Sequence, residues 1–308
     1  MDIFELAKKS KDILKPFGET DVLLYYGIVV PSLSKYLKRK EIAAKNWLGK
    51  DAFSPFLLKR GSKLMELKAE YFTEATPDFL KIRSETKKLD DARKKLTQKQ
   101  QLLWEYFIPR HLSDLFYATN SEGAGKQIER IFIDIDRGNV GQKITQKATH
   151  ALAEEIESDK MFMEKYKGEL SAMWTGNSFH IYIFLDKPIT PKDYEENIAY
   201  SKKDPLGSFI GRWAQKVRNK LGIKVLGSHE KIKNAITLDP SQTPSGKLCR
   251  APFSLHMKDE KTINGVAVPI TTDMLEDDGL TEELKRTKPA DIAEDINEYV
   301  KRLPKRFR

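Results

Sequence analysis

The spacing of apolar positions divides the chain into a region of helical periodicity and a region that alternates strands with helices. In the first part apolar side chains recur at helical spacing, as at Leu64, Leu67, Tyr71 and Phe72. A turn-forming stretch, Thr-Asn-Ser-Glu-Gly-Ala-Gly, then marks a boundary. We therefore predict a mostly helical N-terminal region over residues 1–120, a catalytic core over 121–288, and a C-terminal helix with a basic tail over 289–308.

Short apolar runs and amphipathic segments predict an α+β core. One helix is expected from about Thr145, and a second repeats apolar residues up to Leu221 with Gly222 at its end. The expected strands are short and rich in isoleucine, and they cover residues 131–136, 179–184 and 235–239.

Composition favours a globular protein of the cytoplasm, associated with the nucleoid if the source is prokaryotic. Hydrophobic residues make up 40% and charged residues 32% of the chain. No apolar run approaches the roughly 20 residues of a membrane span, and the N-terminus lacks the order of a signal peptide. For that reason no membrane partner is expected. The single cysteine, Cys249, excludes an internal disulfide and a thiolate zinc module, so no zinc is expected either.

The charge balance is basic, with a formal net charge of +9 and a pI near 9.2. Lysine and arginine displace condensed counterions from phosphates, so an excess of this size suits a polyanionic partner such as nucleic acid.

Three aspartates are candidate metal ligands. Asp134 and Asp136 point to the same side of an extended strand, and adjacent carboxylates of this kind suit Mg²⁺ or Mn²⁺. Two solvated acids at a strand end, or the Asp-x-Asp of some nucleotide-sugar glycosyltransferases, would give the same pattern. Asp239 also ends a predicted strand, and a third carboxylate would complete a site for two-metal phosphoryl transfer, with metals about 4 Å apart.

Cationic and hydroxyl side chains near these strands are candidate phosphate ligands. Ser178 and His180 follow a glycine turn and share one face of a strand. Arg250 offers a planar fork for phosphate, and His256 follows it. Lys247 lies on the loop between, either as a phosphate or template contact or as a solvated lysine.

The order of these motifs resembles the archaeo-eukaryotic primase superfamily. Asp-x-Asp, Ser-x-His, and a strand ending in Asp followed by Arg-Ala-Pro-Phe-Ser-Leu-His occur in that family's order over roughly residues 100–260. That superfamily includes primase small subunits, primase-polymerases and the polymerase domain of bacterial end-joining ligases. The missing thiolate zinc module, and Asn177 before the serine, depart from many of its members.

The resemblance implies an RRM-like sheet packed on a second α/β unit, with the active site between them. It implies two divalent ions on the three aspartates, and a triphosphate held by Ser178, His180, Arg250 and His256. Arg110, ahead of the first motif, would be a further phosphate contact or a structural residue.

The expected function is template-directed nucleotidyl transfer by a DNA primase or primase-polymerase. Its partners would be a DNA template and primer and either NTPs or dNTPs. An end-joining repair polymerase, a metal-dependent nuclease or phosphoesterase, and a non-catalytic replication accessory that binds nucleic acid remain alternatives.

Overall fold

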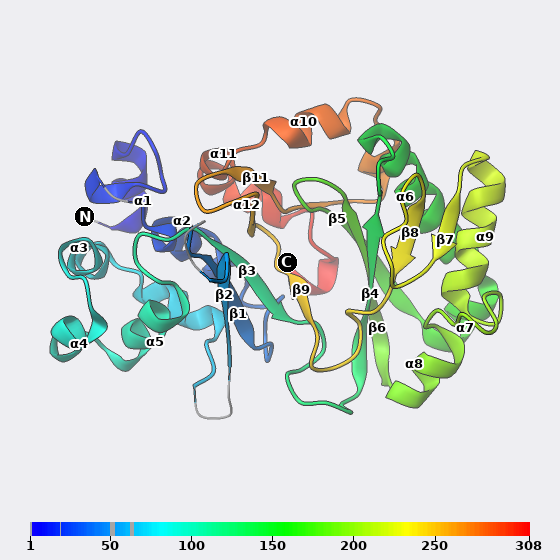
Figure 1. The fold of residues 1–308 in the computed structure, drawn as a ribbon, viewed down its shortest axis with the longest axis horizontal. Helices are drawn as coiled ribbons and strands as arrows, with labels where there is room; N and C mark the ends of the chain where they lie inside the picture. The colour runs from blue at the N-terminus through cyan, green and yellow to red at the C-terminus, as the bar shows by residue number, and fades with distance from the viewer. Residues whose placement is uncertain (1, 19, 50–52, 62–64) are drawn as a thin grey trace.

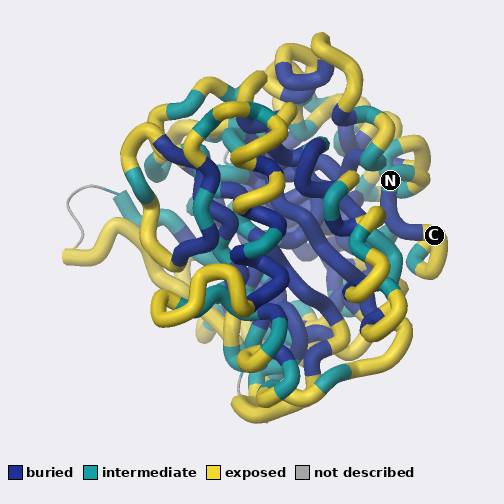
Figure 2. Tube along the Cα trace, turned by 90° about the vertical axis from the view of Figure 1, so that its right-hand side faces the viewer, coloured by how far each residue is buried: buried dark blue, intermediate teal, exposed yellow. Residues whose placement is uncertain are grey.

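Two β-sheets form the middle of the molecule, and helices cover their outer sides (Figure 1). The computed structural model describes residues 2–18, 20–49, 53–61 and 65–308. The buried trace runs through the centre of the molecule and exposed segments surround it, as Figure 2 shows.

The strands belong to a six-stranded sheet, a four-stranded sheet and a hairpin. The six-stranded sheet has the order β12-β5-β6-β4-β8-β7, and the four-stranded sheet has the order β2-β1-β3-β9. In chain order they are β1 (Ile42–Trp47), β2 (Phe56–Arg60), β3 (Ser113–Ala118), β4 (Ile128–Asp136), β5 (Gly168–Trp174), β6 (Phe179–Ile189), β7 (Val225–Gly227), β8 (Ile236–Asp239), β9 (Leu248–Arg250), β10 (Leu255–Met257), β11 (Ile263–Val266) and β12 (Val268–Ile270).

The helices lie mainly at the two ends of the molecule and over its top in the view of Figure 1. They are α1 (Ile3–Lys9), α2 (Val22–Val29), α3 (Pro77–Glu85), α4 (Leu89–Ala92), α5 (Gln98–Tyr106), α6 (Gln142–Ser158), α7 (Lys160–Tyr166), α8 (Pro191–Asn197), α9 (Phe209–Leu221), α10 (Leu280–Arg286), α11 (Pro289–Glu294) and α12 (Ile296–Val300). Short 3-10 turns are η1 (Pro16–Gly18), η2 (Pro31–Leu33), η3 (Ala69–Glu74), η4 (Arg93–Lys95), η5 (Asp273–Glu276) and η6 (Lys305–Phe307).

The six-stranded sheet contains the expected RRM-like unit. Along the chain β4 is followed by α6, β5, β6, α9 and β8, and in the sheet these strands lie in the order β5-β6-β4-β8. This is the βαββαβ arrangement of ferredoxin-like folds. The α+β prediction is therefore confirmed, as are its three strands and the helix capped by Gly222, which has a left-handed φ of 65°.

The N-terminal region contains five short helices, α1 to α5, among its described residues, and also three strands that the apolar pattern did not indicate. The periodicity expected around Tyr71 and Phe72 falls on the short turn η3, and Leu64 lies outside the described residues. This segment is divided into separate helices, because α3 begins after its N-cap Thr76 and α5 begins after its N-cap Thr97. Within the described residues no helix is both long and apolar enough to cross a membrane.

Strand β3 pairs with β9, which comes late in the chain, so one sheet joins segments from both sides of the turn near residue 120. Helix α2 is buried along its whole length beside this sheet. Its N-cap, Asp21, forms an ion pair with the Arg83 guanidinium at 2.7 Å, and the Arg83 side chain is 0% exposed. This pair holds α2 to α3, and the Tyr26 hydroxyl of α2 donates to the Ser113 carbonyl of β3 at 2.7 Å, which holds α2 to the sheet.

Candidate active site

The three aspartates meet on one face of the six-stranded sheet. Asp134 of β4 lies opposite Asp239 of β8 and opposite His180 of β6. Side chains of directly opposed residues in antiparallel strands project from the same face, so His180, Asp134 and Asp239 form a row across three strands. Asp136 lies two residues further along β4 on the same side, while the intervening Ile135 is buried.

Each carboxylate has different neighbours. Asp239 accepts hydrogen bonds from the Ser241 backbone N–H at 2.8 Å and from the Ser241 hydroxyl at 3.0 Å. The Lys231 ammonium lies 2.6 Å from Asp136 Oδ1. The carboxylate of Asp134 lies 3.5 Å from Nε2 of His180.

The cluster is short of positive charge. Burial, together with the negative charges of Asp136 and Asp239, raises the pKa of Asp134 to about 7. Burial lowers the pKa of His180 well below its usual range, and Arg250 adds to this, so the imidazole supplies no charge at neutral pH. A divalent cation would supply the missing charge.

The three carboxylates are suitable ligands for a divalent cation, although their side chains are not oriented to bind one. Carboxylate oxygens with open positions are what Mg²⁺ and Mn²⁺ prefer. Across the described ranges, no three His, Cys, Asp or Glu side chains are arranged so as to hold a metal ion. The reason is visible in the contacts: Asp136 faces Lys231, and Asp239 faces Ser241 and His229.

The Ser-x-His motif lies beside this row of acids. His180 is 7% exposed, and its ring meets Phe132 edge-on at 4.7 Å between centroids. The Ser178 hydroxyl donates to the backbone carbonyl of Ile135 on β4. In this arrangement Ser178 stabilises the strand pairing, and its oxygen can still accept a hydrogen bond from a ligand.

Arg250 and His256 approach from the four-stranded sheet and the β10–β11 hairpin. Arg250 Nη1 donates to the Leu255 carbonyl at 2.6 Å, and its guanidinium lies over the Phe116 ring at 5.0 Å. His256 Nδ1 lies 2.7 Å from the Thr175 carbonyl, so this nitrogen donates and Nε2 carries the lone pair. Burial, together with the charge of Arg250, lowers the pKa of His256 to about 4.

Lys247 and Arg110 are not in contact with the aspartates. Lys247 is exposed just before β9, whose last residue is Arg250. Arg110 is exposed, has a positive φ of 67°, and donates to the Ser84 carbonyl of α3 at 2.6 Å. Their assignment to the nucleotide remains a prediction.

Several side chains near the site were not predicted from the sequence. Lys45 of β1 lies opposite Asp114 of β3, and its ammonium lies 4.1 Å from the centroid of the Phe56 ring. Burial lowers the pKa of Lys45, while the charge of Asp114 raises it and that of Arg250 lowers it further. Lys45 was missed because β1 was not recognised as a strand.

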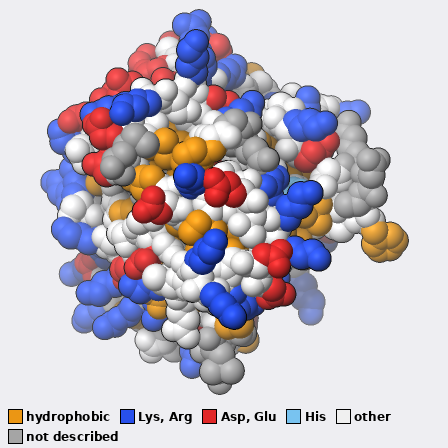
Figure 3. Space-filling view, turned by 90° about the vertical axis from the view of Figure 1, so that its left-hand side faces the viewer, with side chains coloured by type: hydrophobic (Ala, Val, Ile, Leu, Met, Phe, Trp, Pro, Cys, Tyr) orange, Lys and Arg blue, Asp and Glu red, His pale blue; other side chains and the backbone are white. Residues whose placement is uncertain are grey.

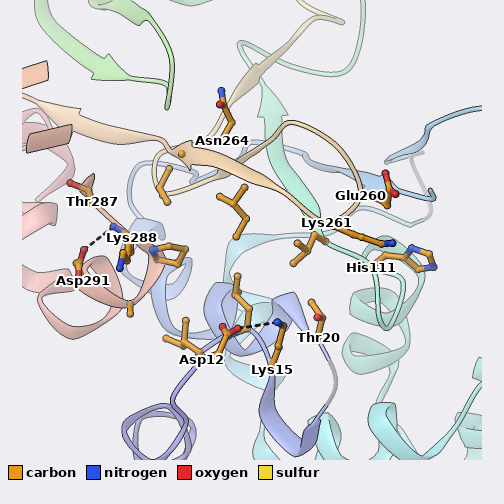
Figure 4. Close-up of a pocket in the computed structure, with 18 of the residues that line it drawn as sticks. Asp12, Lys15, Thr20, His111, Glu260, Lys261, Asn264, Thr287, Lys288 and Asp291 are labelled. Atoms are coloured by element: carbon orange, nitrogen blue, oxygen red, sulfur yellow. Dashed lines mark hydrogen bonds and ion pairs between the residues drawn. The ribbon is translucent and has the colours of Figure 1, made fainter. Parts of the chain in front are cut away.

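A large cavity lies apart from the three aspartates. It measures about 1350 Å³, and its lining includes seven Lys or Arg side chains and three acidic ones. Figure 4 shows the Lys15 side chain paired with Asp12 on one side of this cavity, and the Lys288 backbone N–H donating to the Asp291 carboxylate on another. Lys261 of the hairpin side faces the same space, so the excess of cations is distributed around the opening.

The fold is similar to that of the polymerase domain from Mycobacterium tuberculosis Ligase D, solved in complex with DNA. The two chains superpose with a TM-score of 0.54 at 17% identity, over 95% of this chain and 96% of that one. No protein-family model and no curated protein matches this sequence. The likeness is therefore one of fold, and it agrees with the primase-polymerase superfamily that the motifs resemble.

Proposed function

We propose that this chain is a metal-dependent nucleotidyltransferase of the primase-polymerase type, which adds nucleotides to a strand paired with a DNA template. The observation that carries the proposal is the row formed by His180, Asp134 and Asp239, with Asp136 beside it and Arg250 facing it from the other sheet. Clustered carboxylates next to cationic phosphate ligands are the parts that two-metal nucleotidyl transfer requires.

Asp134, Asp136 and Asp239 would hold two Mg²⁺ or Mn²⁺ ions. When bound, such ions lower the pKa of the attacking 3′-hydroxyl and neutralise charge on the leaving pyrophosphate. The strand pairing of β4 with β8 fixes the backbone spacing between Asp134 and Asp239, so only their side chains would need to turn to bind an ion.

The triphosphate would lie against Arg250, His256 and His180. Nη1 of Arg250 donates to the Leu255 carbonyl and lies 3.5 Å from Asp114 Oδ1. These two contacts orient the remaining N–H groups of the guanidinium. His256 is held at Nδ1 and His180 is neutral, so both act through polar contacts rather than charge. Lys45 would add a cation from β1.

The charge distribution supports a nucleic-acid partner. The net charge is +9, and the large cavity has an excess of cations. On the face in Figure 3, Lys and Arg side chains are spread over the surface with acidic side chains between them. A phosphate backbone would therefore meet several separated cations rather than one dense patch.

A repair polymerase that fills DNA ends is a second candidate, and the fold likeness to a ligase-associated polymerase domain favours it. It would use the same three aspartates. The two candidates differ in whether a primer must be present.

The test offers the protein a single-stranded DNA template or a primer-template, with Mn²⁺ or Mg²⁺ and either NTPs or dNTPs. New short strands on the bare template indicate a primase, and growth of the primer alone indicates a polymerase that only extends. A shortened primer would indicate a nuclease instead. Salt-sensitive DNA binding that needs no metal, with no product formed, would indicate a DNA-binding protein without catalytic activity.

A further inference from the structure

The loop between β7 and β8 brings two basic side chains to two of the three aspartates. Lys231 places its ammonium 2.6 Å from Asp136 Oδ1, and His229 places Nδ1 3.1 Å from Asp239 Oδ1. The proposed nucleotidyl transfer uses neither side chain. Both side chains nevertheless contact the proposed metal ligands, so both can affect how those ligands bind a metal.

The loop is fixed to the strands that carry the aspartates. The Ser228 N–H donates to the Leu238 carbonyl at 3.2 Å, and the Glu230 N–H donates to the Ser228 hydroxyl at 3.0 Å. Gly138, in the turn after β4, has a φ of +51°, and a Cβ there would lie 2.5 Å from the Ile232 carbonyl oxygen. Backbone thus packs on backbone, and this contact holds the loop beside the end of β4.

Lys231 and Asp136 differ in how easily they can leave their contact. The Lys231 side chain is 75% exposed, whereas that of Asp136 is 13% exposed. An exposed ammonium exchanges its ion pair for water at little cost. A divalent ion on Asp136 would need the same oxygen lone pairs and would repel the ammonium, so the two cations compete.

His229 acts on a carboxylate that is already well oriented. Asp239 Oδ1 accepts from the Ser241 N–H and contacts His229, and Oδ2 accepts from the Ser241 hydroxyl. The Asp239 side chain is 14% exposed, and the His229 side chain is 45% exposed. Hydrogen bonds to a ligating carboxylate fix its direction, and their loss typically weakens metal binding by roughly 10- to 100-fold.

We infer that the β7–β8 loop sets the metal affinity of the aspartate cluster through two opposed contacts. Lys231 lowers the affinity, because its ammonium holds Asp136 until a divalent ion replaces it. His229 raises the affinity, because it orients Asp239. Both are positioning residues. The inference rests on the proposed function and names how the metal site of that function is regulated.

The experiment measures Mn²⁺ binding directly, by electron paramagnetic resonance of free Mn²⁺, with the full chain and without nucleotide or DNA. Lys231→Met should lower the Kd about three- to tenfold, and Lys231→Arg should leave it near the wild-type value. Lys233→Met is the matched control, since Lys233 is exposed on the same loop and has no contact with the aspartates, and it should change nothing.

His229→Ala should raise the Kd about tenfold, and His229→Asn, whose amide N–H can take the place of the Nδ1 donor, should recover most of the loss. A Lys231→Met Kd equal to that of Lys233→Met, or higher than wild type, overturns the role of Lys231. A His229→Ala Kd equal to wild type overturns the role of His229.

Two further measurements separate this inference from the proposed function. If the wild type binds no Mn²⁺, or if Asp134→Asn combined with Asp239→Asn binds it equally well, the metal site of the proposed function is lost and the inference falls with it. If the wild type binds Mn²⁺ and the double variant does not, the metal site stands. The loop variants then decide the inference alone. Thermal unfolding of each variant checks that it is folded.

Discussion

Asp134 and Asp239 lie directly opposite each other on adjacent antiparallel strands, although they are far apart in the sequence. Like charges in that position destabilise a sheet. The cost is visible in the pKa of Asp134, which burial and the neighbouring carboxylates raise to about 7. The folded protein without metal should therefore carry a measurable, pH-dependent penalty at this pair.

Replacing Asp134 by Asn should stabilise the metal-free protein at pH 8. Because the folded pKa is raised above the unfolded value of 3.8, the stability from protonated Asp134 is complete below about pH 4 and is lost by pH 7. We expect the variant to exceed the wild type by on the order of 4 kcal/mol at pH 8, since one pKa unit corresponds to about 1.4 kcal/mol, and to match it near pH 4. Urea unfolding in EDTA at both pH values measures this. A difference that does not change with pH would contradict the prediction.

Removing either acid of the first motif should abolish catalysis and spare the fold. We expect Asp134→Ala and Asp136→Ala each to lower primer extension by at least about 1000-fold, because a metal ligand is lost. Asp278→Ala, which removes an exposed acid paired with Lys147 of α6, is the control and should extend primers normally. Extension by either motif variant at the wild-type rate would mean that the active site lies elsewhere.

Exchanging Arg250 for Lys should mainly weaken nucleotide binding. The charge stays, but the fork that Leu255 and Asp114 orient is lost, so we expect the KM for nucleotide to rise about tenfold with a smaller change in kcat. Steady-state extension kinetics measure both constants. Arg93→Lys, at an exposed N-terminal site, should leave both as they are.

Breaking the buried pair between Asp21 and Arg83 should destabilise the whole fold. Asp21→Asn leaves a fully buried guanidinium without its charge partner, and we expect a loss of about 3–5 kcal/mol in the free energy of unfolding. Glu298→Gln, which removes an exposed pair with Lys301, should change that free energy by less than about 0.5 kcal/mol. Equal effects of the two substitutions would show that the buried pair is not a main contribution to stability.

The sequence predicts β4, β6 and β8 of the six-stranded sheet because these strands have strong local patterns. The isoleucines before Asp134 and Asp136 alternate with them, and the apolar side chains that end at Leu221 repeat at helical spacing. Strand β9 has only three residues, and neither β9 nor β1 alternates apolar and polar residues in a way that would predict a strand. These strands form because distant partners pair with them, which a local pattern cannot reveal.

The sequence predicted which acidic residues lie together, but not their contacts. Spacing on strands identified Asp134, Asp136 and Asp239, and the register of β4 against β8 then sets which acids are opposed. His229 and Lys231 come shortly before Asp239 in the sequence, in a chain with 54 Lys and Arg residues. Their roles depend on the loop conformation, which no residue pattern specifies.

The pairing of β3 with β9 has a consequence for the order of folding. The four-stranded sheet gains its last strand only when residues 248–250 join a segment made much earlier, at 113–118. Contacts of such long sequence separation slow folding and link distant segments into one cooperative unit. During synthesis, the edge of β3 therefore stays open until most of the chain has left the ribosome, and the first 120 residues cannot complete their own sheet.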